Sequence, residues 1–276
     1  SAMSSAERIF QLIDTKSNLP LPANPRRPEK ISGKVHFKNV TFGYLPDHPI
    51  LHNFDLKIDA GETVAIVGAT GSGKTTIINL LERFYDPAQG RVLLDNHDLR
   101  ELDLQLLRNQ IGLVMQDVLI IPGTVRANIL LNHHLDDKEL AQVISNAQLD
   151  EMITRLPNGL ETIIGEGGQS LSAGQNQLLA LARILARNPG VLVLDEATAN
   201  IDSATEILIE KAIATTLANR TSIIIAHRLS TIRRADRIIV LARGHIVEQG
   251  SHNQLMTLEG HYHSMQQQEQ ITKLRV

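Results

Sequence analysis

The chain carries a glycine-rich stretch that decides its fold, Gly68-Ala69-Thr70-Gly71-Ser72-Gly73-Lys74-Thr75-Thr76. Its first eight residues fit the pattern G-x-x-x-x-G-K-[ST], in which glycines let backbone N–H groups turn inward towards phosphate groups. Lys74 can reach the β- and γ-phosphates of a nucleotide, and the Thr75 hydroxyl can bind Mg²⁺. An apolar run at 63–67 precedes the stretch, and a helical pattern at 74–84 follows it. The stretch therefore predicts a phosphate-binding loop at the N-terminus of a helix.

A second motif ends a short apolar strand in two carboxylates, Val191-Leu192-Val193-Leu194-Asp195-Glu196. Ligands of α/β sheets bind at the carboxyl ends of the strands. There Asp195 can hold Mg²⁺ through water, and Glu196 can take a proton from an attacking water. Alone, the motif fits a strand and an acidic turn equally well, but beside the phosphate loop it predicts a nucleoside-triphosphate hydrolase with bound Mg²⁺.

A third motif narrows this class, because Leu171-Ser172-Ala173-Gly174-Gln175 resembles the signature LSGGQ of ABC proteins. Ser172 lies 23 residues before Asp195, the separation found in that family. The stretch 35–258 as a whole is similar to the nucleotide-binding domain of an ABC exporter of the multidrug or lipid type. The resemblance implies a half-transporter that works as a homodimer or as one half of a heterodimer.

The resemblance assigns further roles one residue at a time. It implies that Tyr44 stacks on adenine and that Gln116 reaches Mg²⁺ and senses the membrane domain. It implies that Glu166 lies in a loop touching the coupling helices, that Asp202 belongs to the D-loop, and that His227 contacts the γ-phosphate. The expected catalytic residues are then Glu196, His227 and Gln116, and the expected metal-binding residues are Thr75, Gln116 and Asp195.

The resemblance also implies partners. Two domains would pair head to tail around two Mg·ATP, with the signature residues Ser172, Ala173, Gly174 and Gln175 of one closing on the nucleotide held by residues 68–76 of the other. Asp202 would lie near the same nucleotide. Closure would pull on a transmembrane domain encoded upstream and drive export, from the cytoplasmic face of the inner membrane.

Several positions depart from the family pattern. The third signature residue is Ala173 instead of glycine, and a Cβ tolerates a positive φ less readily. We therefore expect weaker γ-phosphate binding at that loop. Asn176 and Leu178 replace basic residues, Gly167 replaces a basic residue in the exporter loop, and the D-loop has Asn200 and Ile201 before its aspartate. Such drift is familiar in halves of heterodimeric exporters.

The expected fold is α/β, a phosphate-loop NTPase (ABC ATPase) core with an antiparallel β subdomain and an inserted helical subdomain at about 118–188. Strand patterns occur at 35–42, 51–58, 63–67, 91–94, 111–115, 191–194, 221–226, 237–241 and 246–247. Strand and helix alternate on both sides of 118–188, which reads as several helices. The domain is expected at 33–276, and residues 1–32 as a cloning remnant, a short helix and a proline-rich linker.

Composition excludes other classes. The 276 residues carry a formal net charge of −3, which argues against nucleic-acid binding, and no cysteine, which excludes disulfides and thiolate metal sites. No apolar run reaches the roughly 20 residues that a membrane span needs. Because the linker at 5–28 resembles the join to a last membrane helix, we expect the chain to be a piece of a membrane protein. The alternatives are a hydrolytically weak regulatory half of a heterodimeric exporter and a soluble, non-transport ABC ATPase.

Overall fold

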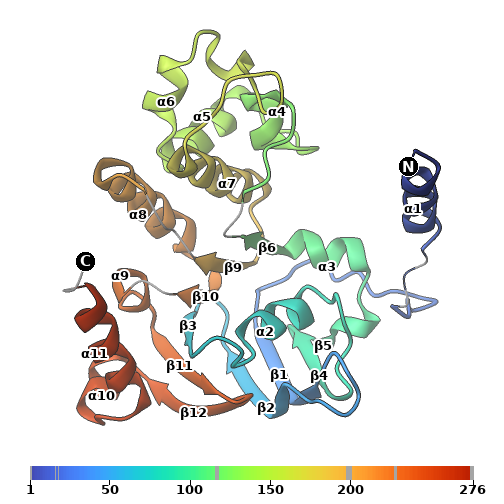
Figure 1. The fold of residues 1–276 in the computed structure, drawn as a ribbon, viewed down its shortest axis with the longest axis vertical. Coiled ribbons are helices and arrows are strands. Elements are labelled where there is room, and N and C mark those ends of the chain that lie inside the picture. Colours follow the sequence, from blue (N-terminus) through green and yellow to red (C-terminus); the bar gives the residue numbers. More distant parts are fainter. Residues whose placement is uncertain are drawn as a thin grey trace.

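The computed structural model describes residues 2–15, 17, 19–115, 118–196, 201–226 and 229–273. In this part of the chain a six-stranded sheet forms the centre, in the order β12-β11-β3-β10-β9-β6 (Figure 1). Its strands are β3 (Thr63–Val67), β6 (Ile111–Val114), β9 (Val191–Glu196), β10 (Thr221–Ala226), β11 (Arg237–Ala242) and β12 (His245–Gly250). All pair in parallel except the edge strand β12. The carboxyl ends of β3 and β9 therefore lie at the same edge of the sheet.

A four-stranded antiparallel sheet, in the order β2-β1-β4-β5, covers one side of this core. It consists of β1 (Val35–Phe42), β2 (Leu51–Ile58), β4 (Gln89–Leu94) and β5 (His97–Asp98), followed by a 3₁₀ turn η1 (Leu99–Glu101). The strands expected at 35–42, 51–58 and 63–67 are confirmed residue for residue, because their hydrophobic patterns match the faces that become buried.

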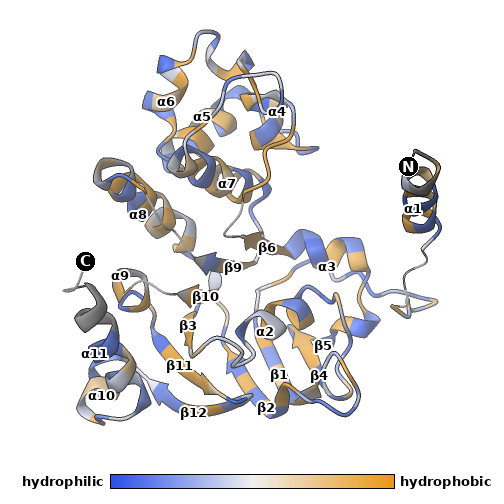
Figure 2. Ribbon diagram, viewed as in Figure 1, coloured by the Kyte–Doolittle hydropathy of each residue, from blue (hydrophilic) through white to orange (hydrophobic). Residues whose placement is uncertain are grey.

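Alternate residues of the central strands face two separate cores. Val64 and Ile66 of β3 pack with α2 (Lys74–Leu81), α3 (Leu104–Gln110) and the antiparallel sheet. Ala65 and Val67 pack on the opposite face with the helices that follow β6 and β9. Figure 2 shows hydrophobic residues along β3 and β11 of the central sheet. Full burial of one aliphatic side chain stabilises a protein by roughly 1.5–3 kcal/mol. The side chains buried on both faces of the central sheet therefore fix the position of its strands.

The stretch between β6 and β9 is mainly helical. It contains α4 (Val125–Leu130), α5 (Asp137–Asn146), α6 (Asp150–Arg155) and α7 (Ala173–Arg187), with a 3₁₀ turn η2 (Gly159–Glu161) and the two-stranded pair β7 (Gly123–Thr124) and β8 (Ile163–Ile164). A capping box marks the start of α5, since Asp136 and Glu139 bond each other's backbone. α7 packs against α8 (Ser203–Leu217), as Figure 1 shows.

The C-terminal part adds α9 (Leu229–Ile232), α10 (His252–Thr257) and α11 (His261–Lys273). Glu248 of β12 accepts hydrogen bonds from the backbone N–H groups of His261 (2.5 Å) and Tyr262 (3.0 Å), and so holds the start of α11 against the sheet. The strand expected at 246–247 is longer than predicted, because β12 pairs with β11 along its whole length.

Part of the N-terminal region at 1–32 is hydrogen-bonded to the domain. Backbone bonds join Arg26 to Glu101 (2.8 Å) and to Asp103 (3.0 Å), so this segment lies against the domain before residue 33. The preceding helix α1 (Ala2–Asp14) stands apart in Figure 1 and exposes Ile9, Phe10 and Leu12. No helix in the described part of the chain is long and apolar enough to cross a membrane.

The helix expected at 74–84 ends earlier than predicted, at Leu81. Arg83 takes a left-handed conformation (φ 50°), and its guanidinium bonds Asp86 (3.0 Å) and the carbonyl of Pro20 (2.7 Å). Glu82 caps the helix and is buried, which raises its pKa to about 7 against the lowering effect of Arg187 and Arg108. Just beyond the end of the helix, the Arg83 side chain thus binds a neighbouring carboxylate and a carbonyl of a distant segment.

Candidate active site

The glycine-rich loop joins β3 to α2, as the sequence predicts. Gly73 is the N-cap of α2 with φ 110°, and a Cβ there would lie 2.9 Å from Leu51 Cδ2. A Cβ at Gly68 would lie 2.3 Å from the carbonyl oxygen of Leu241 on β11. Gly73 is needed for its positive φ, and Gly68 is needed because two backbones approach closely there. The loop is therefore wedged between the two sheets.

Lys74 lies inside this loop. Its side chain is buried, and its ammonium group donates hydrogen bonds to the carbonyl oxygens of Gly68 (2.7 Å) and Ala69 (3.0 Å). Burial lowers the pKa of Lys74, and the negative charge of Asp195 opposes this shift. Thr75 is exposed at the start of α2. The loop thus holds a cation at its centre beside an accessible hydroxyl.

Asp195 lies near the loop across the sheet. It pairs in register with Ile225 of β10, which pairs with Ile66 of β3. Because neighbouring strands are about 4.8 Å apart, its backbone lies roughly 10 Å from the end of β3. The Thr75 hydroxyl and the Asp195 carboxylate are oxygen donors of the kind Mg²⁺ prefers, so they fit this ion. The side chain of Glu196, together with Gln116 and His227, lies outside what the structure describes.

Tyr44 lies in the loop after β1, half-exposed. Its ring makes T-shaped contacts with Phe42 and Tyr85, each with centroids 5.2 Å apart. Its hydroxyl accepts a hydrogen bond from Asn79 Nδ2 of α2 (2.7 Å). Neither Asn79 nor Tyr85 was singled out from the sequence, although Asn79 lies on α2 one turn beyond Thr75, which is a signal for a shared helix face.

The signature residues form the start of α7. Ser172 is the N-cap, and it forms a capping box with Gln175, with bonds of 3.2 and 2.9 Å. Ala173 is the first helical residue, is exposed, and has no positive φ. The Cβ of Ala173 therefore meets no positive φ, so the reason given for weaker γ-phosphate binding does not apply. The weaker binding itself stays a prediction.

Gly174, in contrast, is packed. A Cβ there would lie 2.3 Å from Thr205 Cγ2 and 3.3 Å from Ile201 Cγ2. Asp202 caps α8 by accepting a hydrogen bond from the Thr205 backbone (2.9 Å), and these bonds lower the pKa of its carboxyl. The first turns of α7 and α8 are thus locked together. Asn200 of the expected D-loop lies outside the described residues.

The expected site residues do not all converge within the chain. Among the described residues, no hydrogen bond or ion pair joins residues 171–175 to residues 68–76. The structure therefore brings Lys74, Thr75, Asp195 and Tyr44 around one loop, and leaves the signature as a separate helix start.

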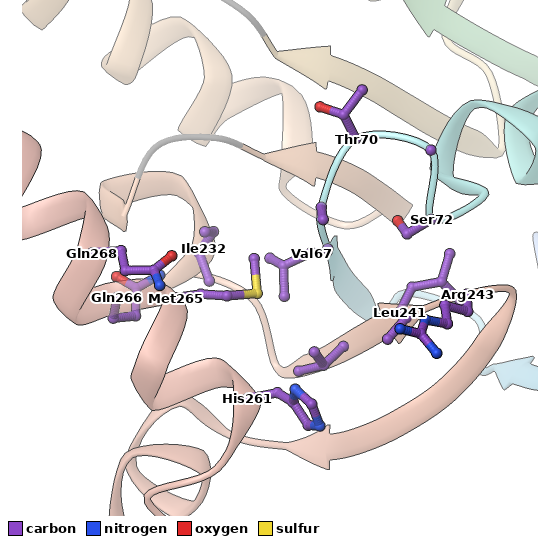
Figure 3. Close-up of a pocket in the computed structure, with 15 residues that line it drawn as sticks. Val67, Thr70, Ser72, Ile232, Leu241, Arg243, His261, Met265, Gln266 and Gln268 are labelled. Carbon is purple, nitrogen blue, oxygen red and sulfur yellow. The ribbon is translucent and has the colours of Figure 1, made fainter.

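A cavity of about 620 Å³ borders the phosphate loop on another side (Figure 3). It is walled by apolar side chains, among them Val67, Leu241 and Met265, and by Ser72 and Gln266. Tyr44 and Asp195 do not line it. Residues 68–72 of the phosphate loop do line it, so the cavity adjoins the loop without including the expected adenine and Mg²⁺ contacts Tyr44 and Asp195.

The packing of Gly174 predicts a position-specific effect. Gly174→Ala should destabilise the fold by about 1–3 kcal/mol, the usual effect of overpacking, whereas Ala173→Gly should cost at most about 1 kcal/mol. Urea denaturation measures both. Thr205→Ser removes the clashing methyl group and should rescue Gly174→Ala. An equal loss at both signature positions, or no rescue, would contradict this packing account.

Comparisons with known proteins agree with the geometry. A family profile described as ABC transporter matches residues 51–199. An uncharacterized ABC transporter ATP-binding protein of Bacillus subtilis is 45% identical over 261 residues, which are 94% of this chain and 43% of that protein. The ATP-dependent lipid A-core flippase of Syntrophus aciditrophicus is 41% identical over 266 residues, 96% of this chain and 44% of that protein.

A solved structure agrees as well. A bacterial Atm1-family ABC exporter with ATP bound matches with a TM-score of 0.85 and 39% identity, covering 97% of this chain and 47% of that chain. The chain thus spans less than half the length of the proteins it matches. These comparisons confirm the resemblance and the α/β fold. The chain belongs to the ABC transporter family, a family of ATPases, and is an ATP-binding domain of the exporter type.

Proposed function

We propose that this chain is the ATP-hydrolysing motor of an ABC exporter, pairing head to tail with a second nucleotide-binding domain around two Mg·ATP. The observation that carries the proposal is the phosphate loop, in which a buried Lys74 lies beside the sheet edge that bears Asp195. An ammonium group held by two carbonyls can exchange them for phosphate oxygens, because charge-assisted bonds to an anion are stronger.

Each residue of the proposed nucleotide site has its own role. The N–H groups of residues 68–76 and the start of α2 bind the phosphates, and Tyr44 stacks on adenine. Thr75, Asp195 and Gln116 hold Mg²⁺, which when bound neutralises charge on the β- and γ-phosphates. Glu196 takes the proton of the attacking water, and His227 contacts the γ-phosphate.

The separation of the two anion-binding helix starts supports pairing. In the described residues the signature has no bond to the phosphate loop of its own chain. The side-chain oxygen of Ser172 accepts a hydrogen bond as the helix cap. The Ser172 hydroxyl hydrogen and the N–H of Gly174 can therefore still bind the γ-phosphate of the ATP held by a partner domain. Because Gly174 packs on α8, closure would move the signature and the D-loop together.

A membrane domain upstream is the remaining part of the proposal. The relatives are more than twice as long as this chain, and one of them is named a lipid A-core flippase. Glu166 is exposed, as a contact to coupling helices requires. We place the domain at the cytoplasmic face of the inner membrane and assign it no particular substrate.

Steady-state phosphate release tests the proposal. The chain should hydrolyse ATP in the presence of Mg²⁺, with a rate per chain that rises with protein concentration, because the active unit is a pair. Chelation of Mg²⁺ with EDTA should abolish the activity. Activity that appears only after mixing with the domain of a different half-transporter would instead favour the alternative that this chain is the regulatory half of a heterodimer. A rate per chain that stays constant at all concentrations would contradict pairing.

A further inference from the structure

We propose that Asn79 is a positioning residue that sets the adenine platform of this domain by holding the hydroxyl of Tyr44. The inference deepens the proposed function and rests on it, because it takes Tyr44 as the residue that stacks on the base. It adds a residue that touches neither the base nor the phosphates. Replacing Asn79 should therefore weaken the binding of nucleotides that carry adenine and leave the binding of the phosphates alone unchanged.

The hydrogen bond fixes the far end of the Tyr44 side chain. Asn79 Nδ2 donates to Tyr44 Oη at 2.7 Å, and Thr76 Oγ1 lies 3.5 Å from the same oxygen. Asn79 is half-buried on α2, whose backbone is fixed by the core below it. Tyr44 itself lies in the exposed connection between β1 and β2. An anchor on the helix thus restrains a ring that the loop alone would leave free to change rotamer.

Two further rings restrict the orientation of Tyr44. Phe42 and Tyr85 each make a T-shaped contact with it, at interplanar angles of 84° and 79°. These contacts are apolar and tolerate rotation, whereas the hydrogen bond to Asn79 has a defined direction. The three neighbours together pre-organise the platform, and pre-organisation lowers the entropy lost when a base stacks on it.

The position of Asn79 on the phosphate-loop helix gives this anchor a consequence. Lys74 and Thr75 begin α2, and Asn79 lies on its second turn. The same rigid helix therefore sets the place of the phosphates and, through Tyr44, the place of the base. The distance between the two subsites is then fixed by one element, which favours a ligand carrying both groups over either group alone.

Paired ligands test the inference on the chain itself. Asn79→Ala should raise the Kd for Mg·ATP roughly three- to tenfold, the range that one hydrogen bond supports, and leave the Kd for inorganic triphosphate with Mg²⁺ unchanged. Calorimetric titration measures both. An equal loss for the two ligands would overturn the inference, because a general distortion of α2 affects phosphate binding as well.

A double-mutant cycle isolates the route through the hydroxyl. Tyr44→Phe keeps the ring and removes the oxygen that Asn79 holds. In that background Asn79→Ala should have no further effect on the Kd for ATP. A full additional loss would show that Asn79 acts by another route. Asn146→Ala is the matched control, since Asn146 is a half-buried helical asparagine that bonds Gln142 in α5 and should leave both Kd values unchanged.

The outcome separates this inference from the proposed function. Tyr44→Ala removes the whole platform and should weaken ATP binding more than Asn79→Ala, again with triphosphate binding intact. If Tyr44→Ala leaves the ATP affinity unchanged, the stacking role in the proposed function fails. If Tyr44→Ala weakens binding and Asn79→Ala does not, only the positioning role of Asn79 fails.

Discussion

Replacing Glu196 with glutamine is expected to leave Mg·ATP binding intact and to lower turnover by about 10²- to 10⁴-fold, the usual contribution of a general base. Glutamine has nearly the same size and cannot accept the proton of the attacking water. β9 ends on Glu196, directly after Asp195, so the residue stands at the edge of the sheet that bears the phosphate loop. Phosphate release under saturating ATP measures the effect.

The same variant should accumulate the ATP-bound pair. Because hydrolysis would reset the pair, blocking it leaves the closed form as the stable state in the presence of Mg·ATP. Size-exclusion chromatography with ATP should show a dimer for Glu196→Gln. Glu259→Gln, which changes an exposed carboxylate in the same way, should behave as the unchanged chain does. Normal turnover in Glu196→Gln would remove Glu196 from the role of base.

Lys74→Ala should lose nucleotide binding. A hydrogen bond to a charged group contributes about 1.5–3 kcal/mol, so the Kd for Mg·ATP should rise roughly 10- to 100-fold. The variant also leaves the carbonyls of Gly68 and Ala69 without the partner that draws the loop together. Titration calorimetry measures the Kd, and Lys138→Ala, on an exposed face of α5, is the control. Unchanged ATP affinity in folded Lys74→Ala would refute the assignment of the phosphate loop.

The features that sequence analysis predicted well are those with a local cause. The loop at 68–76 needs glycines and a lysine at fixed spacing, and the structure has this loop between β3 and α2. β1 and β2 match their expected bounds because alternation specifies which face is buried.

The features that were missed or wrong depend on distant contacts. Just beyond the end of α2, Arg83 bonds a carbonyl more than sixty residues away, at Pro20. Asn79 gains its place in the site only because the loop after β1 folds over α2. The positive φ considered at Ala173 is absent, because Ser172 caps a helix that begins there. The need for glycine at 174 lies in Thr205 of a different helix.

The central claim is that each site is built from the phosphate loop of one chain and the signature of another, and mixing two inactive variants tests it most directly. Lys74→Ala disables every phosphate loop. Ser172→Asp keeps the helix cap, since aspartate caps well, and repels phosphate from every signature.

Each variant alone should hydrolyse no ATP, whereas a mixed pair retains one site with an intact loop and an intact signature. An equal mixture should therefore recover about a quarter of the activity of the unchanged chain, because half of the pairs are mixed and each has one site. A mixture that stays as inactive as the separate variants, at a concentration where the unchanged chain hydrolyses ATP, would contradict the head-to-tail account.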